Sequence, residues 1–203
     1  MLEVILSGLV TGWAIAVPVG AVGAFLVTLT ARTSWRVGSA AAMGVATVDG
    51  VYAAAAVLGG AALASALEPV ATPLRVASAL VLLAVAALTL RHAVATRTSP
   101  APADRPMRPW AAYSLFVGIT AVNPATVVYF AAVVLGNRDL VETGLEGVAF
   151  VGAAFVASAS WQLALAAGGA SLGRFVSGPR GRLVTGIASG LVIAGLAVWT
   201  LVS

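Results

Sequence analysis

The sequence contains no cysteine, no lysine and a single histidine, His92. Without cysteine, the chain cannot form disulfides, thiolate metal sites or thiol redox relays. One histidine is too few for a multi-histidine metal site, and the sequence has no nucleophile triad and no glycine-rich nucleotide loop. We therefore predict no metal site, no cofactor and no catalytic residues, and we do not expect an enzyme.

Charged residues are also scarce. They make up 9% of the 203 residues, whereas 61% are hydrophobic, and an average soluble domain has roughly 25% charged residues. A chain of this size cannot hide so much apolar surface from water, and a disordered chain needs the opposite composition. The composition predicts a small multi-pass protein of the lipid bilayer. The net charge of +4 then marks cytoplasmic loops rather than a nucleic-acid surface.

Stretches of about 20 apolar residues, enough to cross a bilayer, occur six times. They cover residues 4–31, 37–66, 76–95, 110–136, 147–172 and 184–202. We expect loops between them, because 68–75 contains two prolines and 97–109 contains four, and proline interrupts helices. The first run is too long for a cleavable signal, so we expect the N-terminus to begin the first span. The predicted fold class is an all-α membrane protein with six transmembrane helices.

The arginines predict the orientation of these spans. The loops after the first, third and fifth spans, together with Arg91 near the end of the third span, hold nine of the eleven arginines, and the opposite side holds Arg75 and Arg138. Cytoplasmic loops carry the excess of positive charge in membrane proteins. The nine-arginine side is therefore predicted to be cytoplasmic, with both termini outside.

Two short patterns of the first half recur in the second. The stretch GWAIAVP, which ends at Pro18, matches GITAVNP, which ends at Pro124, at an offset of 106 residues. LGGAAL at 58–63 matches AGGASL at 167–172, at an offset of 109. With three spans in each half, the second half enters the membrane from the opposite side. The pattern therefore predicts an inverted repeat, which is common in transporters.

The repeat divides the chain into two three-helix halves and a proline-rich cytoplasmic loop. They cover residues 1–96, 110–203 and 97–109 respectively. The offset of 109 makes Asp49 equivalent to Ser158, and Tyr52 equivalent to Trp161.

Asp49 is the only acidic residue inside a predicted span. It lies near the bilayer midplane, where an ionised carboxylate costs at least roughly 2.5–3.5 kcal/mol. Such residues face the interior of a helix bundle or a water-filled cavity. Asp49 is a candidate site for a cation, an ammonium group or a coupling proton. The structural alternative is a hydrogen-bonded aspartate that holds helices together.

Prolines interrupt the first and fourth spans at similar depth. Asn123 and Pro124 have the residue types that favour the N-cap and first residue of a new helix. A helix N-terminus within the membrane offers backbone N–H groups to a carboxylate. Pro18 and Gly20 form the corresponding element in the first span. We predict a substrate site at these two breaks, and ordinary proline kinks are the alternative.

Further polar and aromatic side chains fall inside the predicted spans. They are Thr120, Tyr129, Trp161 and Gln162. We include them as candidates for lining the site. The alternative for each is an ordinary role in helix packing.

Residues 16–60 resemble the N-terminal half of the LysE/RhtB superfamily of amino-acid exporters. The matching features, in order, are Pro18-Val19-Gly20, the loop from Arg32 to Arg36, Gly38, Gly44 and Asp49. AVNPATVVYF at 121–130 is similar to the Asn-Pro element of the family's fourth helix. Chain length and span number also fit. The resemblance implies export of amino acids or similar solutes from a bacterial cytoplasm across the inner membrane. It also implies coupling to the proton motive force and association into homo-oligomers.

The sequence thus predicts an alternating-access exporter, with a midplane site between the two halves. The helix breaks would bind the carboxylate of an amino acid, and Asp49 would face an ammonium group or carry a proton. One alternative is a divalent-cation exporter of the same architecture, although one acid without cysteine is a poor site for soft metals. The other is a membrane scaffold that transports nothing.

Overall fold

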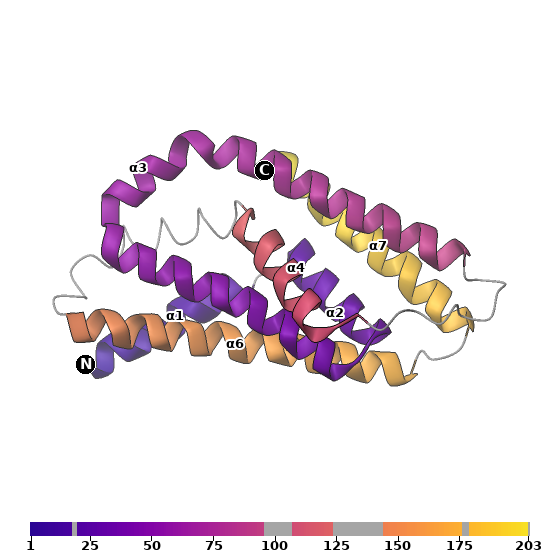
Figure 1. Ribbon diagram of the computed structural model, residues 1–203, viewed down its shortest axis with the longest axis horizontal. Helices are drawn as coiled ribbons and strands as arrows, with labels where there is room; N and C mark the ends of the chain where they lie inside the picture. Colours follow the sequence, from indigo (N-terminus) through magenta and orange to yellow (C-terminus); the bar gives the residue numbers. More distant parts are fainter. Residues whose placement is uncertain (18–19, 96–106, 124–143, 176–178, 203) are drawn as a thin grey trace.

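The computed structural model describes residues 1–17, 20–95, 107–123, 144–175 and 179–202, and within these ranges the regular structure is all helical (Figure 1). The helices are α1 (Leu2–Ala16), α2 (Ala21–Arg32), α3 (Trp35–Ala95), α4 (Pro109–Ala121), α6 (Gly144–Phe175) and α7 (Pro179–Val202). The prediction of an all-α protein is confirmed for the described residues.

The first predicted span is broken where the sequence places Pro18. Helix α1 ends at Ala16, α2 begins at Ala21, and the axes of the two helices differ by 78°. The predicted break is therefore confirmed from both flanks, while Pro18 itself lies outside the described residues. The arginine-containing loop that follows is short, because α2 ends at Arg32 and α3 begins at Trp35.

Helix α3 differs from the prediction. A loop was expected at 68–75, but the backbone stays helical from Trp35 to Ala95. Figure 1 shows that α3 first runs beside α6, then curves round and returns beside α7. Proline removes one backbone hydrogen bond and bends a helix without necessarily ending it. The prediction of a loop is therefore wrong, and the two prolines lie within a curved helix.

Helix α4 begins as expected and ends early. Pro109 is its first residue, where the missing N–H of proline costs nothing. The helix ends at Ala121, three positions before Pro124. Helix α4 thus ends close to the predicted break, and the break in the fourth span itself stays a prediction. Pro124 and the helix predicted to follow it lie outside the described residues.

Two stretches of the described helices are long and apolar enough to cross a membrane, Trp35–Leu58 and Gly144–Gly173. Helices α1 and α2 add a third span if the broken pair counts as one. Ala79–Arg91 is a shorter apolar helical stretch. These stretches support the first, second and fifth predicted spans, and the total of six stays a prediction.

Glycines let α6 approach both halves of the broken first span. A Cβ at Gly8 of α1 would lie 2.6 Å from the Phe150 carbonyl oxygen of α6. A Cβ at Gly169 of α6 would lie 2.5 Å from the Val27 carbonyl oxygen of α2. Small residues at such positions allow close backbone approach, which is typical of helix packing in membranes.

The two contacts of α6 share one register. Phe150 lies beside Gly8 and Ala154 beside Gly12, and each pair is 142 residues apart in sequence. Gly169 lies beside Val27 at the same separation of 142 residues. The chain of α6 therefore runs in the same direction as α1 where it contacts α1, and in the same direction as α2 where it contacts α2. The middle of α6, near residues 159–162, lies level with the break between them.

Candidate functional site

Asp49 is buried within the first part of α3. Its side chain is 5% exposed, and the Ser158 hydroxyl of α6 donates a hydrogen bond to its Oδ2 atom at 2.6 Å. Ser158 is fully buried and lies near the middle of the apolar stretch Gly144–Gly173. Among the described residues, no arginine or other cation pairs with Asp49. A carboxylate accepts about four hydrogen bonds, so Asp49 retains the capacity to accept bonds from a cationic ligand.

The contact between α3 and α6 is antiparallel around this hydrogen bond. Gly50 lies against Phe155, and Ala53 packs with Ala154. Asp49 and Ser158 are separated by 109 residues, which is the offset of the repeated pattern in these two helices. The pair that the repeat makes equivalent is therefore the pair that is in direct contact.

Three further residues that were predicted to line the site carry buried polar atoms. They are Thr120 Oγ1, Trp161 Nε1 and Gln162 Oε1, and none has a hydrogen-bond partner in the part of the chain that the structure describes. A buried polar group without a partner costs about 1–3 kcal/mol, so native proteins keep few of them. Such atoms are suited to bind a polar ligand or water.

Two of these residues lie beside the Asp49 pair on α6. Gln162 is 6% exposed and follows Ser158 by one helical turn, so the two side chains share a face. Both Trp161 and Gln162 lie level with the break between α1 and α2. The predicted residues Asp49, Trp161 and Gln162 are thus brought to one level of the bundle.

Helix α2, which follows the break, begins without a side-chain cap. Gly20 is the N-cap residue of α2, with extended backbone at φ −86° and ψ −169°, and no side chain bonds to this end. The next two residues, Ala21 and Val22, are buried. The first N–H groups of a helix have no partner within the helix. This end of α2 can therefore bind an anion.

Tyr52 joins α3 to the end of α4. Its hydroxyl donates a hydrogen bond to the carbonyl oxygen of Ala121 at 2.6 Å. Ala121 is the last residue of α4, where carbonyl groups lack partners from a following turn. The backbone N–H of Asn123 bonds to the Thr120 carbonyl oxygen at 3.0 Å, which closes the helix end.

Several predicted site residues are not placed. Pro18, Pro124 and Tyr129 lie outside the described residues. Asn123 is described, but its predicted role as an N-cap depends on the residues that follow it. Thr120 lies on α4, next to the carbonyl that Tyr52 binds. The structure therefore brings together the α3 and α6 candidates and leaves the second break incomplete.

Sequence reasoning did not choose Ser158 or Tyr52 as site residues. Serine is common in membrane helices as a packing residue, and tyrosine tolerates many environments. The available signal was the repeat, which pairs Ser158 with Asp49, the only acidic residue inside a predicted span. Among the described residues, no group of three or more His, Asp or Glu side chains could hold a metal ion.

A family model described as LysE type translocator matches residues 13–203 of the chain. This match covers the helices α2 to α7 and the last turn of α1. No curated protein and no solved structure is similar enough to the chain to be matched.

Proposed function

Because this chain belongs to the LysE type translocator family, we propose that it is a secondary exporter of amino acids, with its substrate site at Asp49 and the adjacent helix breaks. The family exports amino acids or related solutes, so the chain is a multi-pass membrane transporter rather than an enzyme. The choice of amino acids, the site and the driving force are the proposed parts.

The observation that carries the proposal is the buried carboxylate of Asp49, fixed by Ser158 level with the break in the first span. An amino acid carries one ammonium and one carboxylate group. Asp49 would bind the ammonium group or carry the coupling proton. The uncapped N-terminus of α2 would bind the carboxylate, through backbone N–H groups and the helix dipole.

The remaining polar candidates fit the uncharged part of such a ligand. Thr120 Oγ1 and Gln162 Oε1 are buried and have no partner among the described residues. The amide of Gln162 can accept or donate a hydrogen bond, depending on which way it is turned. In this proposal both side chains bind the polar substrate, and Asn123 and Pro124 form the equivalent break of the second half.

The contact of Asp49 with Ser158 supports two inverted halves, 1–96 and 110–203. In a structure with two-fold pseudosymmetry, a residue can touch its own equivalent only at the axis. Asp49 and Ser158 are in contact at the repeat offset of 109 residues. Their hydrogen bond would then lie on the axis, where transporters of this architecture bind their substrates near the midplane.

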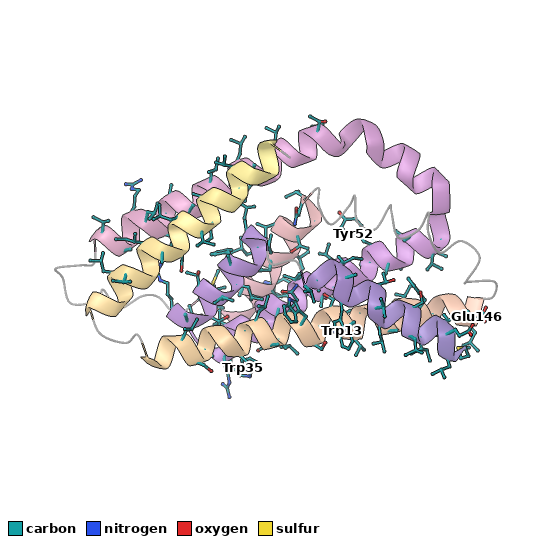
Figure 2. The ribbon with its side chains drawn as sticks, turned by 180° about the vertical axis from the view of Figure 1, so that it is seen from behind. Trp13, Trp35, Tyr52 and Glu146 are labelled. Atoms are coloured by element: carbon teal, nitrogen blue, oxygen red, sulfur yellow. The ribbon has the colours of Figure 1, made fainter. Side chains whose placement is uncertain are left out.

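The remaining expectations concern the membrane. We propose export from the bacterial cytoplasm across the inner membrane, driven by the proton motive force, by a protein that can form homo-oligomers. Glu146 lies at one end of the molecule, and Trp35 lies well away from it on the lower edge (Figure 2). This arrangement suits the proposed orientation, in which Trp35 is at the cytoplasmic interface and both termini are outside.

Uptake into inside-out vesicles under an imposed proton gradient tests the function, because an exporter carries cytoplasmic solute into the lumen of such vesicles. The vesicles are supplied with a panel of labelled amino acids, and Asp49→Asn keeps the side-chain volume while removing the charge. We expect at least a tenfold loss of transport, with elution and thermal stability like those of the original chain. Full activity of Asp49→Asn would exclude the proposed role of this residue. Transport of a divalent cation in place of every amino acid would overturn the proposed substrate class.

A further inference from the structure

The hydrogen bond of Tyr52 holds one of the two helix breaks. Its hydroxyl binds the Ala121 carbonyl oxygen at 2.6 Å, at the end of α4. A proline at position 124 removes the N–H that would otherwise bond to residue 120 of the same helix. The end of α4 is therefore a place where backbone carbonyls need partners from outside the helix. Tyr52 of α3 donates a hydrogen bond to one of these carbonyls and so connects α3 to α4.

The repeat assigns an equivalent to each partner of this bond. Tyr52 corresponds to Trp161 at an offset of 109 residues, and Ala121 corresponds to Ile15 at an offset of 106. Ile15 lies in the last turn of α1, directly before the first break. Both Tyr52 and Trp161 combine an aromatic ring with one hydrogen-bond donor.

The two equivalent donors differ in this structure. The Tyr52 hydroxyl is bonded to the end of α4, whereas Trp161 Nε1 is buried and has no partner among the described residues. A buried donor without a partner is costly in one conformation, but it is useful if another conformation supplies an acceptor. The asymmetry therefore points to a second conformation.

The end of α1 is within the neighbourhood of Trp161. The indole of Trp13, in the same last turns of α1, donates to Ser160 Oγ on α6 at 3.1 Å. Ile15 packs on Ala53 and Ala154, and Tyr52 packs on the same pair. A small rearrangement of α1 against α6 would bring its terminal carbonyls to the Trp161 indole.

We propose that Tyr52 and Trp161 are equivalent positioning residues that hold the two broken helices in turn during transport. Tyr52 holds the end of α4 in the conformation described here, and Trp161 holds the end of α1 in the opposite one. The inference rests on the proposed exporter function, because inverted repeats exchange conformations when the site changes sides. Neither residue needs to touch the substrate.

Opposite effects of two substitutions test this inference. Tyr52→Phe and Trp161→Phe each remove one donor and keep an aromatic ring. A cysteine introduced as Gly20→Cys reports from which side of the membrane the break is accessible. The chain has no other cysteine, and a Cβ at Gly20 would meet no atom within 4 Å. An impermeant maleimide is applied to right-side-out and inside-out vesicles, and the ratio of labelling rates is measured without substrate.

We expect the two substitutions to shift this ratio in opposite directions. Hydrogen bonds between membrane helices are modest, so each shift should be about threefold. The double variant should return close to the original ratio, because both conformations have then lost one bond. Gly118→Cys, which also meets no atom within 4 Å, serves as a second reporter if the first disturbs folding.

Matched controls separate this role from general packing. Tyr113→Phe removes a hydroxyl that bonds to Thr47 Oγ1 between the same two helices α4 and α3. Trp13→Phe removes an indole between α1 and α6. Both controls should leave the ratio unchanged. Shifts in the same direction for Tyr52→Phe and Trp161→Phe, or no shift, would overturn the inference. Since labelling needs no substrate, this result is independent of the transport experiment.

Discussion

At the scale of single residues, the serine opposite Asp49 explains how the membrane interior accommodates an acid. The Ser158 hydroxyl donates to Oδ2 from the neighbouring helix, and both side chains are buried. One oxygen of the carboxylate is thereby fixed in position. The other oxygen stays able to bind an ammonium group or a proton. Ser158 therefore orients the carboxylate without neutralising it.

Replacing this serine should weaken transport more than it weakens folding. Ser158→Ala removes a buried hydrogen bond to a carboxyl group, a kind of bond worth about 1.5–3 kcal/mol when the partner is charged. We expect efflux to fall by at least about tenfold, and Ser158→Thr to recover part of it. The measurement is initial efflux rate in proteoliposomes, at matched protein content.

Ser160→Ala is the matched control for this prediction. Ser160 lies two positions further along α6 and bonds to the exposed Trp13 indole rather than to Asp49. Its replacement should leave efflux close to the original rate. Equal losses for the two alanine variants would show that Ser158 acts only through the packing of α6.

The residues of the site were predictable to different degrees. Asp49 stands out in the sequence because a lone acid in an apolar helix is costly and therefore uncommon. Thr120, Trp161 and Gln162 were less distinctive, and their buried unpaired atoms appear only in the structure. Ser158 and Tyr52 could not be chosen by residue type. Their roles depend on which helices lie side by side, and only the repeat offset gave a hint of that.

At the scale of helices, α6 is the element on which both parts of the broken first span rest. Gly12 of α1 lies against the backbone of Ala154, and Gly173 of α6 lies against the backbone of Ala31 in α2. These contacts fix the level of the break relative to Ser158. The position of the proposed site thus depends on close contacts of backbone with backbone, which only glycine allows.

Adding one methyl group at this contact should destabilise the protein. A Cβ at Gly12 would lie 2.8 Å from the Ala157 Cβ and even closer to the Ala154 carbonyl oxygen. We expect Gly12→Ala to cost about 1–3 kcal/mol, as overpacking does, and to lower the melting temperature in detergent. Gly152→Ala is the control, because a Cβ there meets no atom within 4 Å. A melting temperature for Gly12→Ala equal to that of the control would contradict the close approach.

Helix boundaries were predictable where one local cause decides them. The break in the first span and the start of α4 at Pro109 were predicted from proline alone. The prolines at 69 and 73 mislead, because α3 continues through them. Whether a proline ends a helix or bends it depends on what the bent helix can pack against. Here the curved α3 has α6 beside its first part and α7 beside its last part (Figure 1).

At the scale of the whole molecule, the directions of the helices agree with the proposed two-half arrangement. Helices α1 and α6 run parallel, whereas α3 and α6 run antiparallel around Asp49. Consecutive membrane spans must alternate in direction, so the first and fifth spans should be parallel and the second and fifth antiparallel. The packing of the described helices satisfies both conditions. Chemical labelling can then determine which end of these helices faces the cytoplasm.

The absence of cysteine makes this orientation directly measurable. Ser34→Cys lies between α2 and α3 and Leu145→Cys lies at the start of α6, and both positions are exposed. The arginine distribution predicts that Ser34→Cys reacts with an impermeant maleimide only in inside-out vesicles. Leu145→Cys should react only when the reagent reaches the outer face of the inner membrane, as in cells stripped of their outer membrane.

The two reporters together distinguish the ways in which this prediction can fail. Exchange of the two labelling patterns would keep the arrangement of helices and invert the orientation drawn from the arginines. Labelling of both reporters from one side would contradict the helix directions themselves, because the first part of α3 and α6 begin at opposite ends of the same antiparallel pair. Asp49 would keep its depth after a simple inversion, since it lies near the middle of α3's first span. The direction of transport would then have to be taken from the transport measurement, and not from the distribution of arginines.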